Sequence, residues 1–184
     1  MNTPHTKSSV RDHARANRRA GPAADPHALA DRVLEFLQRL SGPQRVTCYA
    51  SYGTEPDTSI LRERLASAGY DVLLPRVNGA DMEWVVDEGL QATSSMGIAE
   101  PTGRSVPLRP VRAMLIPALS VTLAGDRLGK GGGYYDRALA SLEPDRPPVA
   151  VLVRDDDIVA TLPTEPHDQP IDVIITPTRV VSCP

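Results

Sequence analysis

The chain has 184 residues and a formal net charge of −3, with 41% hydrophobic and 23% charged residues. This length suits one compact domain whose core needs neither disulfides nor a structural metal. No apolar run is long enough to cross a bilayer, which argues against a membrane protein. The two cysteines, Cys48 and Cys183, are far apart and show no metal-ligand spacing, so we expect a reducing compartment and a cytoplasmic protein.

The first 22 residues form a basic arm on an acidic body. Within residues 1–20, five basic side chains against one acidic side chain give +4, so the rest of the chain carries −7 to reach the total of −3. Such an arm indicates an anionic ligand without saying which one. No hydrophobic segment follows it, so it is not a secretory signal, although its Arg- and Ser-containing start also resembles an organelle transit peptide.

Two helices are predicted before the first strand. Residues 7–19 place Lys7, Arg11 and Arg15 four apart on one helical face, and a Gly-Pro pair ends this helix. Asp25 is a predicted N-cap with Pro26 at the first helical position, and the helix that follows carries its apolar residues on one face. Residues 45–50 then form a predicted strand.

The rest of the chain alternates between predicted strands and helices. A turn at residues 51–56 leads to a helix that Asp57 or Thr58 can cap and that ends at Gly69. Strands are predicted at residues 71–75, 82–86, 113–117, 149–153 and 173–175, a helix at 134–142, and a loop-rich region at 87–110. We therefore predict a single α/β domain over residues 1–184, with a mostly parallel sheet flanked by helices.

The stretch of residues 125–136 carries the strongest chemical signal. Three consecutive glycines let backbone amides approach an anion closely, and a predicted helix N-terminus follows them. The spacing is not that of a Walker loop, because only three residues separate its first two glycines and a glycine follows Lys130. It is not the dinucleotide-binding fingerprint either, since Tyr134 stands where the third glycine belongs. A glycine-rich hairpin with incidental charges remains the alternative.

Several motifs, in chain order, resemble the 5-formyltetrahydrofolate cyclo-ligase family. The segment Arg127-Leu-Gly-Lys-Gly-Gly-Gly-Tyr-Tyr-Asp-Arg137 is similar to the signature loop of that family. The basic pair Lys7 and Arg11 also fits, as do Glu55-Pro-Asp-Thr58, Leu73-Leu-Pro75, Met96-Gly-Ile-Ala-Glu-Pro101, Leu115-Ile-Pro117, Leu162-Pro-Thr-Glu-Pro-His-Asp168 and Asp172-Val-Ile-Ile-Thr176. The resemblance covers nearly the whole chain.

The resemblance implies an enzyme that uses ATP and Mg²⁺ to convert 5-formyltetrahydrofolate to 5,10-methenyltetrahydrofolate, with release of ADP and phosphate. A formamide oxygen is a poor leaving group, so the family transfers the γ-phosphoryl group to it before the second folate nitrogen attacks the formyl carbon. Because this ring closure is intramolecular, orientation supplies much of the rate. Phosphoryl transfer itself needs in-line positioning and charge neutralisation.

The resemblance also implies an ATP site made of Lys7, Arg11, Arg127, Gly129, Lys130, Gly131, Gly132, Gly133, Tyr134 and Tyr135. Lys130 would neutralise charge on the transferring phosphoryl group and Tyr134 would line the boundary with the pterin, so these two are the candidate catalytic residues. Without the resemblance, Lys7 and Arg11 suit a solvated basic face or a nucleic-acid arm, and Tyr134 suits a core aromatic.

By the same resemblance, Glu55, Asp57, Met96 and Tyr134 would contact the folate. Asp136 and Asp168 would hold Mg²⁺. The residue types leave other roles open, because Asp57 can cap a helix, Asp136 can favour a helix N-terminus and Asp168 can form a turn. His167 has no partner spacing and stays unassigned.

Two positions depart from the family pattern. Thr122 stands where many members carry an acidic residue, and Arg154 stands where an apolar or aromatic residue is usual. These changes leave open a catalytically altered paralogue that binds ATP or folate without this turnover. A basic-armed nucleic-acid binder is disfavoured by the acidic body and its 4% of aromatic residues, so neither a nucleic-acid nor a membrane partner is expected. The oligomeric state stays undetermined.

Overall fold

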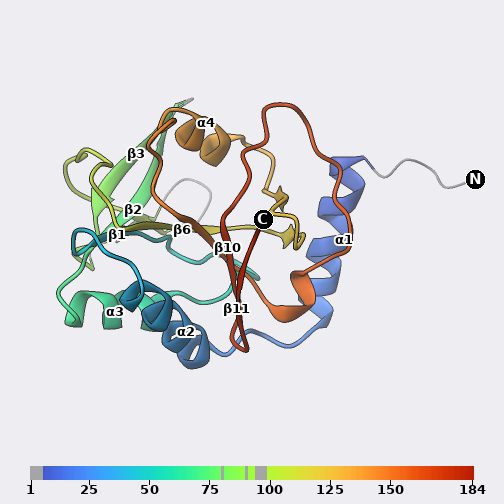
Figure 1. Ribbon diagram of the computed structural model, residues 1–184, viewed down its shortest axis with the longest axis horizontal. Coiled ribbons are helices and arrows are strands. Elements are labelled where there is room, and N and C mark those ends of the chain that lie inside the picture. Colours follow the sequence, from blue (N-terminus) through green and yellow to red (C-terminus); the bar gives the residue numbers. More distant parts are fainter. Residues whose placement is uncertain (1–5, 80, 90, 94–98) are drawn as a thin grey trace, which may run out of the picture.

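A seven-stranded sheet forms the centre of the molecule, with the order β11-β10-β9-β6-β1-β2-β3 (Figure 1). The computed structural model describes residues 6–79, 81–89, 91–93 and 99–184. The parallel strands are β1 (Arg45–Thr47), β2 (Asp71–Asn78), β6 (Ala113–Pro117), β9 (Val149–Leu152) and β10 (Val173–Ile175). Only the edge strands β3 (Asp81–Val86) and β11 (Val180–Ser182) of this sheet are antiparallel to their neighbours. The predicted α/β fold with a mostly parallel sheet is confirmed.

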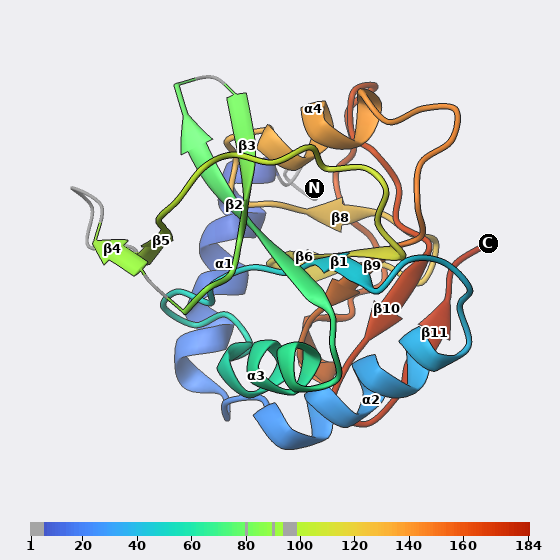
Figure 2. The same cartoon turned by 90° about the vertical axis from the view of Figure 1, so that its left-hand side faces the viewer.

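Helices cover both faces of the sheet. Helices α2 (Pro26–Gln38) and α3 (Ser59–Ser67) lie on one face, and α4 (Tyr134–Ala140) lies on the other (Figures 1 and 2). The strands serve both layers because successive side chains point to opposite faces. Leu74 packs into the cluster beneath α2 and α3, whereas its neighbour Leu73 packs into the cluster beneath α4. Continuous apolar runs in these strands thus reflect burial on both faces.

Helix α1 (Lys7–Ala20) stands apart from these layers, beside the short 3₁₀ turn Asp155–Asp157 (Figure 1). Its own apolar cluster is small: Ala14, Leu119 and Leu128 are buried, with Val10 and Leu162 packed against them. A buried ion pair supplements it, because Arg18 Nη2 lies 2.8 Å from Asp157 Oδ2 and Arg18 also donates to the Ala118 carbonyl at 2.6 Å. Polar anchoring therefore fixes this helix more than apolar burial does.

Arg154, which departs from the family pattern, belongs to the same anchor. Its guanidinium donates to the carbonyl oxygens of Arg18, in the last turn of the helix, and of Pro22, just beyond its end, at 3.1 and 2.7 Å. Its backbone amide donates to Asp157 at 2.9 Å. Arg154 therefore holds the chain that leaves α1 against the body of the protein.

Short strands are where the sequence-based expectations were wrong. The region 87–110, expected to be rich in loops, also contains the antiparallel pair of β4 (Gln91–Thr93) and β5 (Ala99–Pro101). Strands β7 (Ser120–Val121) and β8 (Arg127–Leu128) form a second hairpin, and β11 was not predicted. Strands of two or three residues are too short for a periodic pattern and depend on their partner strand. The first strand ends at Thr47 and α4 at Ala140, both earlier than expected.

The strand order locates the place where a ligand can bind. From β1 the chain continues to β2 and β3 on one side of the sheet, whereas β6, β9 and β10 extend it on the other side. The direction therefore reverses between β1 and β6. In open α/β sheets, ligands bind beyond the carboxyl ends of the strands at such a reversal.

Candidate active site

A cavity of about 610 Å³ opens at the carboxyl ends of β1, β2 and β6. Tyr49 and Ala50 follow β1, Pro75 and Val77 belong to β2, and Pro117 ends β6. The remaining walls come from α1, from Met82 of β3, from the turn around Glu55, from residues 127–136 and from the turn 165–168. Segments that are distant in sequence thus meet at the reversal point of the sheet.

The glycine-rich loop takes a shape that larger residues would disturb. Gly131 has φ of +110°, and a Cβ there would lie 3.4 Å from Cζ of Arg11. A Cβ on Gly132 would lie 2.7 Å from two ring atoms of Tyr134, closer than atoms can pack. Gly133, with φ of +64°, begins helix α4 in a left-handed conformation. The glycines therefore allow the loop to pass close to side chains that line the cavity.

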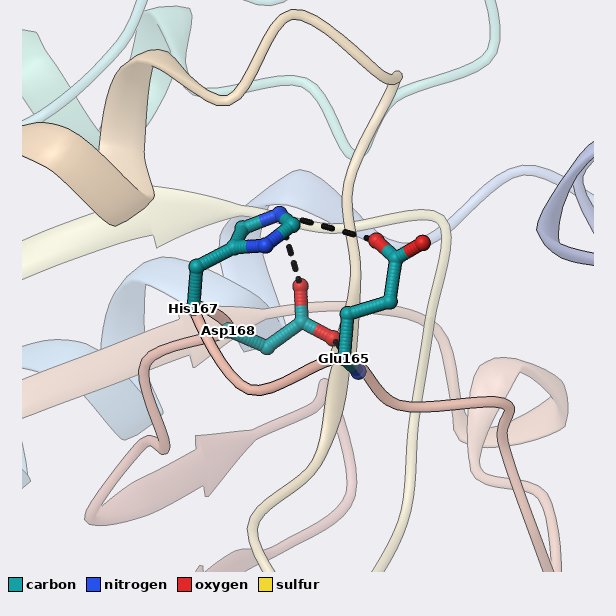
Figure 3. Close-up of side chains that lie close together, drawn as sticks. All are labelled: Glu165, His167 and Asp168. Atoms are coloured by element: carbon teal, nitrogen blue, oxygen red, sulfur yellow. Dashed lines mark hydrogen bonds and ion pairs between the residues drawn. The ribbon is translucent and has the colours of Figure 1, made fainter.

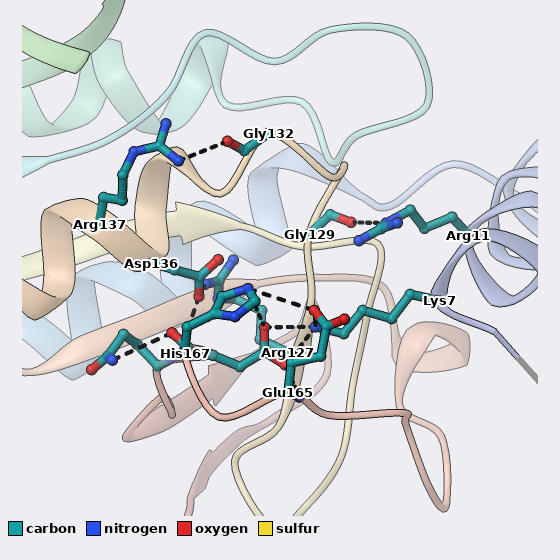
Figure 4. A network of polar contacts seen from close by, with 11 residues as sticks. Lys7, Arg11, Arg127, Gly129, Gly132, Asp136, Arg137, Glu165 and His167 are labelled. Atoms are coloured by element: carbon teal, nitrogen blue, oxygen red, sulfur yellow. Dashed lines mark hydrogen bonds and ion pairs between the residues drawn. The ribbon is translucent and has the colours of Figure 1, made fainter. Parts of the chain in front are cut away.

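Cationic side chains surround this loop. The chain contains only two lysines, Lys7 and Lys130, and both line the cavity. Arg11 donates from Nε to the Gly129 carbonyl at 2.9 Å, which joins α1 to the loop (Figure 4). Arg127 comes from β8, beneath the loop, and its Nε is buried without a hydrogen-bond partner. The gathering of these four cationic side chains at one cavity favours an anionic occupant.

Lys7 reaches from α1 to the turn 165–168. Its Nζ lies 2.6 Å from Asp168 Oδ2 and 2.7 Å from Glu165 Oε2. Burial alone would lower the pKa of Lys7, but the hydrogen bonds to the two carboxylates outweigh it and raise that pKa. Burial likewise would raise the pKa of Asp168, yet hydrogen bonds from Lys7 and from the Glu165 amide hold it below its usual range. Both groups are therefore charged at neutral pH.

Lys130 reaches across the cavity in the other direction. Its Nζ lies 2.7 Å from Glu55 Oε1 and 5.3 Å from the centre of the Tyr52 ring. Glu55 is held by the Tyr52 backbone amide, which donates to its second oxygen at 2.8 Å, and its side chain is only 6% exposed. The Lys130 side chain is 49% exposed, so it can leave this carboxylate at little cost in buried area.

Asp136 is positioned by the residues around it. Its Oδ1 accepts a hydrogen bond from Arg127 at 2.5 Å and one from the Gln169 amide at 3.1 Å (Figure 4). The residue lies in the first turn of α4, where a carboxylate is favoured by the helix dipole. Asp136 therefore both stabilises the N-terminus of α4 and lines the cavity.

Glu165, His167 and Asp168 form a compact cluster at the cavity wall (Figure 3). Within the part of the chain that the structure describes, this is the group whose potential ligand atoms lie within 4.8 Å of one another. His167 Nε2 lies 3.5 Å from Glu165 Oε2 and 3.9 Å from Asp168 Oδ1. The Glu165 amide donates to Asp168 Oδ2 at 2.7 Å, which gives Asp168 its turn-forming role as well. Carboxylate oxygens of this kind suit a hard divalent cation.

The cavity brings together most of the residues singled out from the sequence. Its lining includes Lys7, Arg11, Glu55, Arg127, Gly129, Lys130, Gly131, Gly132, Gly133, Tyr134, Tyr135, Asp136 and Asp168. Asp57 is not part of that lining; it is exposed and caps α3, with Oδ1 accepting from the Ser59 amide at 2.9 Å. Met96 lies outside the described residues.

Some cavity residues were missed by the sequence reasoning. Tyr49 and Tyr52 stand just before the Glu55 turn, and Glu165 and His167 precede Asp168 in its turn. Their proximity to motif residues was the available signal, because side chains beside a binding turn share its wall. Thr122 is not among the lining residues; it closes the β7–β8 turn through a hydrogen bond from Oγ1 to Asp126 at 2.8 Å.

Comparison with known proteins identifies the family. A model of the "5-formyltetrahydrofolate cyclo-ligase family" matches residues 4–177. The chain belongs to the 5-formyltetrahydrofolate cyclo-ligase family. It is 33% identical to a 5-formyltetrahydrofolate cyclo-ligase of Mycolicibacterium smegmatis, over 96% of each chain. Membership in this family of ligases, expected from the motifs, is confirmed, and with it the expectation of an enzyme.

Solved structures of the family have the same fold. The 5,10-methenyltetrahydrofolate synthetase of Aquifex aeolicus superposes with a TM-score of 0.77 at 25% identity, covering 96% of this chain and 92% of that one. The enzyme of the same name from Mycoplasma pneumoniae gives 0.76 at 19% identity, with coverage of 94% and 99%, and supports the fold alone. None of the helices in the described residues has the length and apolarity to span a membrane.

Proposed function

We propose that this protein converts 5-formyltetrahydrofolate to 5,10-methenyltetrahydrofolate, using ATP and Mg²⁺ and releasing ADP and phosphate. The observation that supports this most is that several family motifs, far apart in the sequence, line the same cavity. The cations of α1, the Glu55 turn, the glycine loop and the turn 165–168 are separate family motifs in the sequence, and all of them line one cavity. The two substrates must meet in one place for the γ-phosphoryl group to reach the formyl oxygen.

The nucleotide half of the cavity fits a triphosphate. Lys7, Arg11 and Arg127 supply positive charge around a loop whose glycines leave room for phosphate oxygens close to the backbone. Lys7, Arg11 and Arg127 contact acceptors of the protein itself, namely Asp168, the Gly129 carbonyl and Asp136 respectively. We infer that Lys7 and Lys130 exchange their carboxylate partners for phosphate oxygens when ATP binds.

The folate half is supported by aromatic and apolar side chains. Tyr49, Tyr52, Val77, Met82 and Tyr134 line the side of the cavity nearest β1, β2 and β3. Tyr134 donates from its hydroxyl to the Gly79 carbonyl at 3.2 Å, which fixes the ring between the loop and the β2–β3 hairpin. A flat pterin needs such faces, and Glu55 supplies a buried carboxylate for its N–H groups.

The carboxylates also fit a magnesium ion. Asp136 and Asp168 both line the cavity, and Glu165 and His167 lie beside the second of them. When bound, Mg²⁺ would neutralise charge on the phosphate oxygens. Asp168 would hold it after Lys7 moves to a phosphate; Lys7 now contacts the carboxylates of both Asp168 and Glu165 and offsets the repulsion between them.

Lys130 is the candidate for charge neutralisation during phosphoryl transfer. It sits on the glycine loop and already bridges to Glu55 on the folate side, so it lies at the border between the two halves. A lysine is a mobile point charge, which suits a group that must follow the transferring phosphoryl. Tyr134 forms the neighbouring wall and orients the pterin so that the second nitrogen can attack the formyl carbon.

A spectrophotometric assay of methenyltetrahydrofolate formation tests the proposal. Product should require 5-formyltetrahydrofolate, ATP and Mg²⁺ together, and Lys130→Ala should lower kcat by about 10²-fold or more, as loss of a charge-stabilising group does. Arg32→Ala is the control, because it removes a half-exposed charge on α2 that does not line the cavity. ATP binding without product in the unaltered protein would instead favour the altered paralogue that binds ATP or folate without this turnover.

A cytoplasmic location is also proposed. It is supported by the state of Cys48 and Cys183, which are both free thiols. Burial raises the pKa of Cys48 to about 12, so this thiol is inert.

A further inference from the structure

One face of helix α1 runs from the cavity to the buried ion pair at the other end of the helix. Lys7 and Arg11 line the cavity (Figure 4), and Ala14 and Arg18 are the buried residues of this helix. Their spacing of four, three and four residues places all four side chains on the same face. A rise of 1.5 Å per residue puts Arg18 roughly 16 Å from Lys7 along the axis. Whatever fixes Arg18 therefore also fixes the direction in which Lys7 and Arg11 point.

The other contacts of α1 resist a rotation of the helix only weakly. The helix contributes the small side chains of Val10 and Ala14 to the apolar cluster beneath it. The contacts of Lys7 with Asp168 and of Arg11 with the loop lie at the cavity, where a bound anion competes for both cations. A helix held at that end alone would turn when its cations change partners. The contacts that hold its rotation must therefore lie away from the ligand.

The guanidinium of Arg18 makes such contacts. Its Nε and Nη2 donate to the two carboxylate oxygens of Asp157, at 3.1 and 2.8 Å, so the pair is bidentate. Nη2 also donates to the carbonyl of Ala118, at 2.6 Å, and Ala118 itself lines the cavity. The donors of a guanidinium are fixed in one plane, so these three hydrogen bonds together define the rotation of α1.

Arg154 fixes the carboxylate that Arg18 binds. Its backbone amide donates to Asp157 Oδ2 at 2.9 Å, and its guanidinium donates to the Arg18 carbonyl at 3.1 Å. Arg154 stands two residues beyond the end of β9, so the central sheet holds this carboxylate in place. We call Arg18, Asp157 and Arg154 the α1 anchor.

Arg18 is not among the residues that line the cavity, so it can affect a ligand only through other residues. We propose that Arg18 of the α1 anchor is a positioning residue: it sets the rotation of α1 and thereby points Lys7 and Arg11 at the phosphate groups of ATP. This inference rests on the proposed function. It assigns to the far end of the helix a part of the affinity for the nucleotide.

Isothermal titration with ATP and Mg²⁺, without folate, tests this role. Arg18→Lys keeps the positive charge but loses the planar fork, so we expect ATP to bind roughly tenfold more weakly, as loss of a charge-assisted hydrogen bond causes. The Kd for 5-formyltetrahydrofolate should stay within about twofold, because the cations of α1 lie on the nucleotide side. In Lys7→Ala, the same Arg18→Lys change should weaken ATP binding by a smaller factor, because one of the two positioned cations is already absent. An equal factor in both backgrounds would overturn the proposal.

Leu65→Ala controls for a loss of stability without a change in α1. Leu65 is fully buried on α3, in a core cluster that includes no residue of α1. Its truncation leaves a cavity and destabilises the fold, yet the folded protein should bind ATP within about twofold of the unaltered protein. If Leu65→Ala weakened ATP binding as much as Arg18→Lys, the effect of Arg18 would be one of stability alone and the proposal would fail.

Acylation of Lys7 gives a second readout that needs no ATP. The Lys7 side chain is 14% exposed between the carboxylates of Asp168 and Glu165, whereas the Lys130 side chain is 49% exposed. A turned helix withdraws Lys7 from these carboxylates. Mass spectrometry should therefore show a severalfold faster modification of Lys7 relative to Lys130 in Arg18→Lys. An unchanged ratio of the two rates would overturn the proposal.

The two readouts separate this inference from the proposed function. Equal affinity for ATP in Arg18→Lys and in the unaltered protein would refute the positioning role and leave the reaction standing. If the unaltered protein bound no ATP but Arg18→Lys still exposed Lys7, the reaction would be refuted and the control of α1 by Arg18 would stand.

Discussion

The ion pair between Arg18 and Asp157 allows a quantitative prediction, because it is buried and connects α1 to the body of the protein. The two side chains are 1% and 5% exposed. Removing one partner of such a pair costs about 3–5 kcal/mol, since the other charge stays buried without compensation. The loss would fall on α1, which carries Lys7 and Arg11 into the cavity.

The surrounding contacts predict which partner costs more. In Arg18→Met, Asp157 keeps the Arg154 amide at 2.9 Å and its guanidinium Nε at 3.7 Å, so we expect the lower end, about 3 kcal/mol. In Asp157→Asn, Arg18 and Arg154 both remain as buried cations without a carboxylate, so we expect the upper end, about 5 kcal/mol. For a chain of this size, the first change corresponds to a fall in Tm of roughly 6–12 °C.

Urea unfolding followed by circular dichroism measures both free energies of unfolding. Arg15→Met is the control from the same helix, because its ion pair with Asp12 is 40% and 73% exposed and should contribute less than about 1 kcal/mol. The reasoning fails if Asp157→Asn is less destabilising than Arg18→Met. It also fails if both changes cost no more than the control.

Three further predictions concern the cavity. Gly132→Ala should displace the Tyr134 ring, because the new Cβ would lie 2.7 Å from it. We expect kcat/KM to fall by roughly tenfold to 10²-fold, with little change in the free energy of unfolding. An unchanged kcat/KM in steady-state kinetics would contradict this. The pKa of Asp168 is held below its unfolded value by Lys7, so its contribution to stability is present above about pH 4 and is lost as the pH falls through the lowered pKa. Between about pH 6 and pH 3, the free energy of unfolding measured with urea should therefore fall less steeply with pH in Lys7→Ala than in the unaltered protein. Equal dependence on pH in the two proteins would refute the role of this lysine. The Lys130 side chain is 49% exposed and that of Lys7 only 14%, so an acylating reagent should modify Lys130 first. ATP with Mg²⁺ should slow the modification of both lysines. Mass spectrometry measures the order, and earlier modification of Lys7 would contradict the prediction.

Much of the fold was predictable because it depends on local patterns. Asp25 followed by Pro26 marks the start of α2, and its side chain does accept hydrogen bonds from the amides of His27 and Ala28. Runs such as residues 113–117 are buried on both faces, and the sequence shows this as an uninterrupted apolar stretch. The two-residue strands β7 and β8 could not be found, since two residues are too few for a periodic pattern and their pairing is seen only in the folded chain.

The candidate site, like the fold, was predictable from the sequence only in part. From the sequence alone, the types of residue were determined: a glycine loop with no Cβ to obstruct it, cations before and within it, and carboxylates after it. Only the tertiary structure decided that Lys7 meets Asp168, 161 residues away, and that Asp57 caps a helix outside the cavity. It also assigned Thr122 to a turn and Arg154 to the anchor of α1. The physical reason is that a residue's chemistry is local, whereas its partner is chosen by the order of strands in the sheet, which brings distant segments to one edge.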